Sequence, residues 1–382
     1  MKIGLVCPYR LQTPGGVSEH VRALAKELRL SGHQATVISP GFGVKKIGES
    51  SLYVGRAVKV PSPNKSWSYV SVYVDTSLES LRKIIDTYNF DIIHFHEPLA
   101  PFLCWQVLKV STAVNVATFH SEWALTADSF LVDSLQFLLN PLLPRFKEKL
   151  AGVIAVSEVA RRSWSEVFDG SISEIVIPNG VSLSRFKPQN SPLRVFGDKP
   201  TILYVGRVEA RKGLHYLIDA FRLLEKGMPE VRLVVVGAGP LLAKHKLWVL
   251  KNNLADKVFF AGRVPGQGLP SYYRGADVFC SPATGGESFG IVLLESMASG
   301  TPLVVFDNPG YGELLQRCPW PEVLATCRNT QELSDKLKEM LTNSRLRKKV
   351  RQWGLKEVRN YEWSRITKKV IRFYDEIMEK HS

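Results

Sequence analysis

The chain of 382 residues has no long apolar run, and no stretch approaches the roughly 18 consecutive apolar residues that a membrane-spanning helix needs. Cysteine is scarce, with 5 residues and no CxxC pair, so neither a disulfide framework nor a structural zinc site is predicted. The N-terminal residues Met1–Val6 have the pattern of a buried strand and lack the cleavage region of a signal peptide. We therefore expect a cytoplasmic protein.

Acidic residues are too few to balance the basic ones, and the formal net charge is +14. Residues 1–185 carry 19 Lys and Arg against 16 Asp and Glu, whereas residues 186–382 carry 31 against 20. Much of the excess lies between Lys336 and Arg372, with 13 basic and 3 acidic residues. Such a surface favours an anionic partner: a nucleotide diphosphate, an anionic lipid leaflet or nucleic acid. Solvated helix faces with a basic bias would explain it equally well.

A dinucleotide fingerprint is also missing. The segment Gly237-Ala238-Gly239-Pro240 has no third glycine at the required spacing, and a proline follows at once. This argues against an NAD-dependent dehydrogenase. No internal sequence repeat or low-complexity segment is present.

Strands alternate with helices in the same way in each half of the chain. The expected order is strand, loop, helix, strand: Lys2–Cys7, Pro8–Val17, Ser18–Ser31 and Gln34–Ser39, then Thr201–Val205, Gly206–Gly213, Leu214–Lys226 and Val231–Val236. Further apolar strands are expected at Asp91–Phe95, Asn115–Phe119, Val153–Val156, Val258–Ala261, Val278–Ser281 and Leu303–Phe306. Near-continuous apolar strands are typical of parallel sheets covered on both faces. The pattern predicts an α/β protein with two Rossmann-like, doubly wound domains facing a central cleft.

Composition places the domain boundaries. We assign residues 1–185 to the N-terminal domain and residues 200–355 to the C-terminal domain, with the polar stretch Lys187–Pro200 as the linker. Residues 356–382 are expected to form a helix that packs back towards the N-terminal domain.

The segment Thr284–Glu295 combines glycines, a carboxylate, an apolar helix start and a second carboxylate. Glycines allow close approach to a ligand, and amides at a helix N-terminus suit a diphosphate. Glu287 could accept hydrogen bonds from sugar hydroxyls, and Glu295 could hold a ribose. An ordinary helix start, with Glu287 and Ser288 as capping residues, is the alternative.

The loop Gly206–Gly213 places three cations after a strand. Arg207 and Lys212 could clamp a pyrophosphate and neutralise the charge that grows on a departing nucleoside diphosphate. The Gly15-Gly16 turn in the first half could bring amides to the same diphosphate.

Three histidines lie in or directly after two predicted strands of the first half of the chain. His120 ends the strand Asn115–Phe119, where it could hold a sugar hydroxyl. His94 and His96 share one strand face, but a metal site would need a third ligand that the sequence does not show, so we interpret both as structural.

A helix after residue 76 has the start signal of a capping box, Thr76-x-x-Glu79. The aromatic residues ahead of it, with Lys65, could seat at a membrane interface, although a core-packed helix after an edge strand is favoured.

Together these segments resemble the GT-B glycosyltransferases of family 4, over nearly the whole chain. Within that family the resemblance is greatest to the phosphatidylinositol mannosyltransferases. It rests on the segments Cys7-Pro8-Tyr9, Pro14-Gly15-Gly16-Val17, His96-Glu97-Pro98, Ala117-Thr118-Phe119-His120, Ile177-Pro178-Asn179-Gly180-Val181 and Gly285–Leu293.

The resemblance implies retaining transfer from a nucleotide sugar, with GDP-mannose expected, no tightly bound cofactor and no catalytic metal. It makes the first domain the acceptor domain and the second the nucleotide-sugar domain. It implies that His120 and Glu287 are the catalytic residues, with His120 beside the donor sugar. The implied donor contacts are Gly16, Arg207, Arg211 and Lys212 at the diphosphate, Glu295 at the ribose, Val264 near the base, and Glu287, Ser288, Phe289, Gly290 and Ile291 at the sugar and phosphates.

Departures from the family concentrate on the acceptor side. The implied acceptor residues are Tyr9, Ser18 and Asn64; Tyr9 and Asn64 match the inositol-lipid pattern, whereas Ser18 stands where glutamine is usual. Pro63 replaces a tyrosine, and Tyr69 stands roughly where an arginine contacts lipid phosphate.

The sequence therefore predicts a retaining glycosyltransferase that moves mannose or a related hexose onto a lipid headgroup such as phosphatidylinositol. Its partners would be a nucleotide sugar, a lipid or polyol acceptor and the anionic inner face of the cell membrane, with which it would associate peripherally. A transferase with a soluble acceptor, such as inositol phosphate or polysaccharide, is the alternative. A basic nucleic-acid-binding module is a remote one, since no recognition motif is present.

Overall fold

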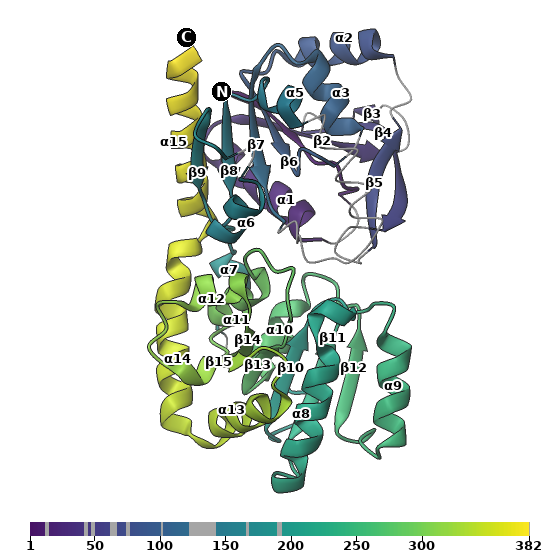
Figure 1. Cartoon of the computed structure of the whole chain (residues 1–382), viewed down its shortest axis with the longest axis vertical. Coiled ribbons are helices and arrows are strands. Elements are labelled where there is room, and N and C mark those ends of the chain that lie inside the picture. The colour runs from purple at the N-terminus through teal and green to yellow at the C-terminus, as the bar shows by residue number, and fades with distance from the viewer. Residues whose placement is uncertain are drawn as a thin grey trace. The chain divides into compact units, whose positions relative to one another are not determined.

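The computed structural model describes residues 1–11, 15–41, 45–46, 50–61, 67–73, 77–100, 102–121, 143–165, 168–188 and 193–381. The chain forms two compact units (Figure 1). The first unit comprises Met1–Gly180 together with Trp363–Ser382, and the second comprises Val181–Glu362. These divisions fall a few residues from the boundaries expected from composition, and they place Lys187–Pro200 within the second unit.

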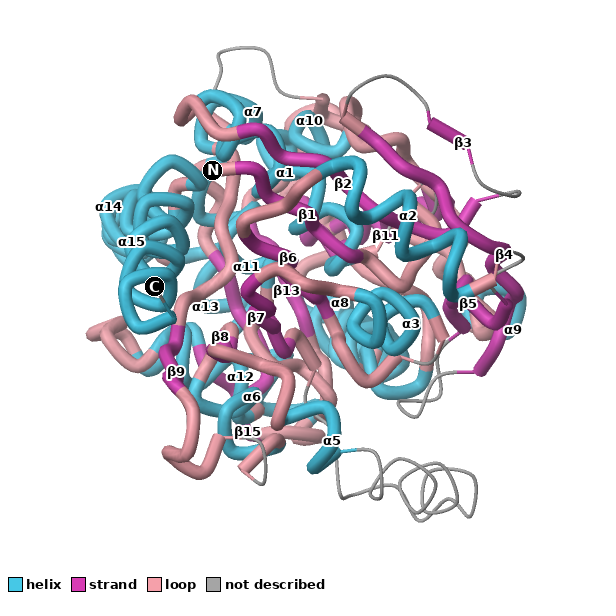
Figure 2. Tube along the Cα trace, turned by 90° about the horizontal axis from the view of Figure 1, so that it is seen from above, coloured by secondary structure: helices cyan, strands magenta, loops and turns pink. Residues whose placement is uncertain are grey.

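The first unit contains a sheet that, within the described residues, has the strand order β3-β4-β2-β1-β6-β7-β8-β9, with β5 paired to β4. Strands β1, β6 and β7 run side by side in its middle (Figure 2). The strands are β1 Lys2–Val6, β2 Gln34–Gly41, β3 Lys45–Lys46, β4 Ser51–Pro61, β5 Trp67–Tyr73, β6 Ile92–His96, β7 Val114–Phe119, β8 Gly152–Ala155 and β9 Ser173–Val176.

Most of this sheet is parallel, as predicted, but one edge is not. Strands β3 and β5 each pair antiparallel with β4. Antiparallel neighbours can be joined by a short connection, whereas parallel neighbours need a longer crossover, which explains how successive segments such as β4 and β5 can pair.

The helices of the first unit include two that share its core, α1 and α15, which contact each other. On α15 the buried side chains recur at helical spacing: Trp363, Ile366, Val370, Phe373, Tyr374 and Ile377. They belong to one apolar cluster with residues of α1, β1, β2, β6, β7 and β8. The helices are α1 Gly16–Leu30, α2 Leu78–Tyr88, α3 Leu103–Val110, α5 Leu143–Lys147, α6 Glu158–Ser163 and α15 Trp363–His381.

The start of α2 corrects the predicted capping box. The N-cap is Ser77, one residue later than Thr76, and its hydroxyl accepts the backbone N–H of Ser80 at 3.1 Å. A serine hydroxyl satisfies one of the helix's unpaired amide groups as well as threonine does, so the sequence signal was ambiguous by one position.

The second unit contains an all-parallel sheet in the order β12-β11-β10-β13-β14-β15. Its strands are β10 Thr201–Val205, β11 Arg232–Val236, β12 Val258–Gly262, β13 Val278–Ser281, β14 Leu303–Asp307 and β15 Leu324–Thr326. Its helices are α7 Leu183–Phe186, η2 Ala210–Lys212, α8 Leu214–Gly227, α9 Leu242–Lys251, α10 Leu269–Gly275, α11 Ile291–Ser299, α12 Pro309–Leu315, η3 Pro321–Val323, α13 Thr330–Thr342, α14 Ser344–Glu357 and η4 Val358–Tyr361. The prediction of two Rossmann-like α/β domains is confirmed.

Of the helices described, none combines the length and the apolar character required to cross a membrane.

Candidate functional site

Three loops of the second unit leave the sheet at the same edge. They follow β10, β12 and β13, and because all the strands are parallel, their carboxyl ends meet there. The loop after β10 spans residues 206–213, and the loop after β13 spans residues 282–290. The carboxyl edge of an open parallel sheet is the usual place for a ligand.

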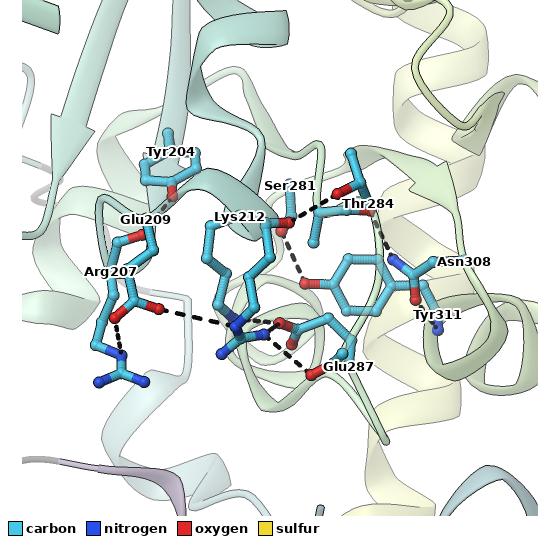
Figure 3. A network of polar contacts seen from close by, with 12 residues as sticks. Tyr204, Arg207, Glu209, Lys212, Ser281, Thr284, Glu287, Asn308 and Tyr311 are labelled. Carbon is cyan, nitrogen blue, oxygen red and sulfur yellow. Dashed lines mark hydrogen bonds and ion pairs between the residues drawn. The ribbon is translucent and has the colours of Figure 1, made fainter. Parts of the chain in front are cut away.

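Hydrogen bonds to backbone carbonyl groups hold the loops after β10 and β13 together. The Thr284 N–H donates to the carbonyl of Arg211 at 2.8 Å. In return, Arg211 Nη1 donates to the carbonyl of Gly286 at 3.0 Å. The cations of one loop are thereby fixed against the carboxylate of the other (Figure 3).

Glu287 lies between two of these cations. Its Oε1 is 2.6 Å from Arg211 Nη1 and 2.6 Å from Lys212 Nζ. Burial raises the pKa of the Glu287 carboxyl. The charges of Lys212 and Arg211 lower it by more than burial raises it, so the pKa falls below its usual value. Glu287 is therefore a carboxylate, fixed in place and accepting from both neighbours.

Burial lowers the pKa of Lys212, and the attraction of Glu287 opposes that effect. The ion pair with Glu287, rather than contact with solvent, therefore favours the charged form of Lys212. A third cation, Arg207, is more open, with 43% of its side chain exposed.

Glu209 is a member of this group that the sequence did not identify. Its side chain is 6% exposed, with Oε1 3.4 Å from Arg207 Nε and Oε2 3.7 Å from Arg211 Nε. Acidic and basic groups thus alternate from Arg207 through Glu209 and Arg211 to Glu287 and Lys212, with three cations and two carboxylates. The signal was available, since Glu209 stands two residues from an arginine on each side.

Two glycines make this loop geometry possible. Gly213 ends the first loop with φ +68°, and a Cβ there would lie 1.9 Å from the carbonyl oxygen of Pro282. Gly290 is the N-cap of α11 with φ +102°, and a Cβ there would lie 2.8 Å from the Tyr311 ring. Neither position accepts a side chain without a shift of the loops.

The start of α11 has a different cap from the alternative considered above. The N-cap is Gly290, which has no side chain to make a capping bond, so neither Glu287 nor Ser288 is the N-cap residue. Phe289 is buried, while Ser288 and Ile291 are half-buried. The carboxylate of Glu287 is thus engaged by cations and not by the helix end.

Glu295 lies one turn into α11. The hydroxyl of the buried Tyr273 donates to its Oε2 at 2.9 Å, which fixes the carboxylate. Val264 lies in the loop between β12 and α10, half-buried, at the same sheet edge. The structure therefore brings Arg211, Lys212 and Glu287 into direct contact, links Arg207 to them through Glu209, and places Glu295 and Val264 on neighbouring elements.

The first unit holds a second group of polar residues, at the carboxyl ends of β6 and β7. His120 follows β7, and its backbone N–H donates to Glu97 Oε1 at 2.7 Å. Its ring Nε2 lies 3.0 Å from Nδ1 of His96, so one imidazole donates and the other accepts. The His20 ring, from α1, packs edge-on against His120 with centroids 4.5 Å apart.

Each histidine of this group also has other neighbours. Nδ1 of His20 lies 2.8 Å from Asn179 Oδ1. Both ring nitrogens of His94 are hydrogen-bonded, one to Tyr374 and one to Thr118. His94 therefore has the structural role that the sequence suggested.

The sequence did not show a third ligand for a metal site with His96, but the structure places two further imidazoles beside it. His20, His96 and His120 each offer a nitrogen, and these nitrogens lie within 4.8 Å of one another. Residues far apart in sequence supply them, which strand periodicity does not reveal. An ion ligated by His96 Nδ1 and His120 Nε2 would have to replace the hydrogen bond that joins them.

Burial keeps these rings neutral. It lowers the pKa of His20 to about 4 and that of His94 to about 3. It holds the pKa values of His96 and His120 well below 6.5. Neutral His120 can both donate and accept hydrogen bonds, as contact with a sugar hydroxyl requires.

The remaining predicted residues of the first unit lie near the start of α1. Gly16 is the first residue of α1 and is exposed, whereas Ser18 is 2% exposed. Tyr9 is half-buried and pairs with Val70 in an isolated bridge. Asn64 lies outside the described residues.

The chain matches known protein families in both of its halves. Residues 14–185 match Glycosyltransferase Family 4, and residues 186–357 match Glycosyl transferases group 1. The chain is 35% identical over 382 residues to the phosphatidyl-myo-inositol mannosyltransferase of Mycobacterium leprae, covering 99% of this chain and 97% of the relative.

Two further similarities are more distant. The alpha-monoglucosyldiacylglycerol synthase of Streptococcus pneumoniae is 26% identical over 332 residues, covering 82% of this chain and 73% of the relative. The structure of sucrose-phosphate synthase from Thermosynechococcus elongatus matches with a TM-score of 0.76 at 22% identity, covering 99% of both chains. The chain belongs to the family 4 glycosyltransferases, with the GT-B fold.

Proposed function

We propose that the protein is a retaining mannosyltransferase that uses GDP-mannose and acts on a lipid headgroup such as phosphatidylinositol. It would associate peripherally with the cytoplasmic membrane face. The 35% identical relative supports the mannose donor and the inositol-lipid acceptor. The Streptococcus pneumoniae relative, whose name also specifies a glycosylated lipid, supports a lipid acceptor in general.

The observation that carries the proposal is the position of Glu287 between Arg211 and Lys212. A nucleotide sugar needs cations at its diphosphate and an acceptor of hydrogen bonds at its sugar hydroxyls. The group in the second unit supplies both, and its net charge of +1 complements an anionic donor.

In the proposed reaction, the bond between the sugar's anomeric carbon and the diphosphate oxygen breaks as the acceptor hydroxyl oxygen bonds to that carbon on the same face. The hydroxyl proton passes to an oxygen of the departing diphosphate. Arg207, Arg211 and Lys212 neutralise the charge that grows on that group. We assign Glu295 to the ribose, Val264 to the base, and Gly16 and His120 to the diphosphate and sugar respectively.

Glu287 is suited to positioning rather than to nucleophilic attack. The two cations at its Oε1 lower its pKa, and a carboxylate stabilised in this way is a weak nucleophile. In the proposed reaction, retention therefore does not proceed through a covalent intermediate on Glu287 of the kind that retaining glycosidases form.

The test uses purified protein, GDP-[14C]mannose and mixed lipid vesicles that include phosphatidylinositol. We expect chloroform-extractable label with the wild type and almost none with Lys212→Ala. Label only in a water-soluble product would favour a soluble acceptor, such as inositol phosphate. No label from GDP-, UDP- or ADP-sugars with any lipid would overturn the proposal.

A further inference from the structure

Helix α9 of the second unit exposes an apolar stripe that the proposed chemistry does not use. Leu247 is 58% exposed and Leu250 is 61% exposed, which makes them two of the most exposed large apolar side chains in the part of the chain that the structure describes. They stand three residues apart on one helix and so share a face. Ala243, four residues before Leu247, is exposed as well.

Lysines flank this stripe on both sides. On a helical wheel, Lys244 and Lys251 fall on one side of the two leucines, and Lys246 falls on the other. All three lysines are exposed. We call Leu247, Leu250, Lys244, Lys246 and Lys251 the α9 surface.

The opposite face of α9 is anchored in the unit. His245 and Val249 are buried. Trp248 is half-buried under Arg222 of α8, whose guanidinium carbon lies 5.8 Å from the ring centroid. The leucines therefore point outward from a helix that is already fixed. Figure 1 shows α9 at the outer side of the second unit, next to β12.

The charges around the α9 surface restrict what can cover it. Residues 242–255 contain no aspartate or glutamate. The carboxylates of Asp219 and Glu225 on α8 are close to cations of their own, Arg222 and Lys257. A second copy of the chain would bring lysines against lysines, because a two-fold interface pairs each patch with itself.

We propose that the α9 surface docks on an anionic lipid bilayer. The leucines would enter the boundary between headgroups and acyl chains, while the lysine stems extend along them to the lipid phosphates. This deepens the proposed function, which has a lipid acceptor, by naming a surface that holds the enzyme at the membrane. It does not depend on the identity of the sugar or of the acceptor.

The test measures co-sedimentation of the full chain with phosphatidylcholine vesicles, with and without phosphatidylglycerol, in the absence of donor. We expect binding to the anionic vesicles only. Leu247→Gln with Leu250→Gln should weaken it on the order of tenfold. Lys244→Gln, Lys246→Gln and Lys251→Gln together should weaken it at least as much, and remove most of its salt dependence.

Matched controls are available elsewhere on the chain. Leu30→Gln alters a leucine that is 72% exposed on α1, and Lys348→Gln with Lys349→Gln removes two exposed lysines of α14. Both should bind within about twofold of the wild type, since neither lies on the α9 surface. Leu250→Trp keeps an apolar side chain and should strengthen binding, which tests the idea without risk to the fold.

Wild-type protein that does not bind anionic vesicles would overturn the proposal, as would α9 variants that bind like the wild type. A change from dimer to monomer in the leucine variant, measured by light scattering, would also overturn it in favour of self-association. Thermal shift with GDP is measured in parallel. Lost vesicle binding with an intact GDP shift separates failure of the α9 surface from failure of the proposed donor site.

Discussion

The ammonium group of Lys212 lies 2.6 Å from the Glu287 carboxylate, and Arg211 reaches the same oxygen at the same distance. Adjacent residues on one loop thus hold a carboxylate from another loop. An anionic ligand can bind the same two cations while Glu287 keeps its contacts with them. The Glu287 carboxylate is then never buried without a partner. The contact therefore organises the site before a donor binds, which reduces the cost of ordering it.

Glu287→Gln should reduce kcat/KM for the nucleotide sugar on the order of 100-fold, because the amide no longer positions Lys212, Arg211 or the sugar hydroxyls. It should also destabilise the fold by roughly 3–5 kcal/mol, since two cations lose a buried partner. Steady-state kinetics and urea unfolding check both effects. Glu339→Gln, at an exposed position on α13, is the matched control. Near-normal turnover would remove Glu287 from the proposed site.

Glu209→Gln should raise KM for the nucleotide sugar about tenfold with a smaller change in kcat. The reason is that Arg207 and Arg211 lose the carboxylate that orients them, at 3.4 and 3.7 Å. Glu230→Gln, whose carboxylate is 69% exposed, should leave KM unchanged. If KM in Glu209→Gln equals that of the wild type, Glu209 has no part in orienting the arginines.

Tyr273→Phe should raise KM for the nucleotide sugar roughly three- to tenfold, because one hydrogen bond to a charged group is worth about 1.5–3 kcal/mol and only part of it affects ligand binding. The Tyr273 hydroxyl holds Glu295 at 2.9 Å. The neighbouring Tyr272→Phe is the control. The assignment of Glu295 to the ribose would be contradicted if Tyr273→Phe weakened binding of a sugar phosphate without a ribose by a similar factor.

The neutral histidines make stability dependent on pH. The pKa of His20 falls from 6.5 to about 4 on folding, so the unfolded chain binds the proton more tightly. The resulting contribution of His20 to the free energy of unfolding is on the order of 3 kcal/mol. It is fully present above pH 6.5 and is lost as the pH falls towards 4.

We therefore expect the melting temperature of the wild type to be steady from pH 8 to 7 and to fall steeply below 6.5, while His20→Gln falls less steeply. Thermal melts in matched buffers measure this. Leu30→Gln, at an exposed position of α1, is the control and should keep the pH dependence of the wild type. Equal slopes for His20→Gln and the wild type would show that this cluster does not control acid unfolding.

Chelation should not reduce activity. The cations of the proposed donor site are the side chains Arg207, Arg211 and Lys212, and the ring nitrogens His96 Nδ1 and His120 Nε2 already bond to each other. Dialysis against EDTA, followed by assay and by metal analysis of the protein, checks the expectation. A loss of activity on dialysis that Zn²⁺ restores would instead indicate that His20, His96 and His120 hold an ion.

Much of this fold could be predicted from the sequence, because buried parallel strands leave an uninterrupted apolar pattern. Strands β10 and β13 have the predicted bounds, and the loops that follow them contain the predicted cations and Glu287. Glycine-rich loops after such strands indicate where a ligand lies, since the fold brings the carboxyl ends of parallel strands together.

The parts that could not be predicted depend on contacts between distant segments. His20 and His120 reach His96 from α1 and from the end of β7, and local periodicity does not register such convergence. The exposed leucines of α9 occur at ordinary helical spacing, so their sequence pattern does not distinguish an outward face from a buried one.

The final 19-residue helix, α15, belongs to the core of the unit in which the chain begins. During synthesis, residues 363–381 follow the whole second unit, so Trp363, Ile366 and Phe373 can close the apolar face of the first unit only after the second unit has been made. The second unit lies wholly upstream of that point and can finish first. A chain released after residue 362 should thus contain a folded second unit and an incomplete first unit, whose uncovered apolar face would be a target for chaperones.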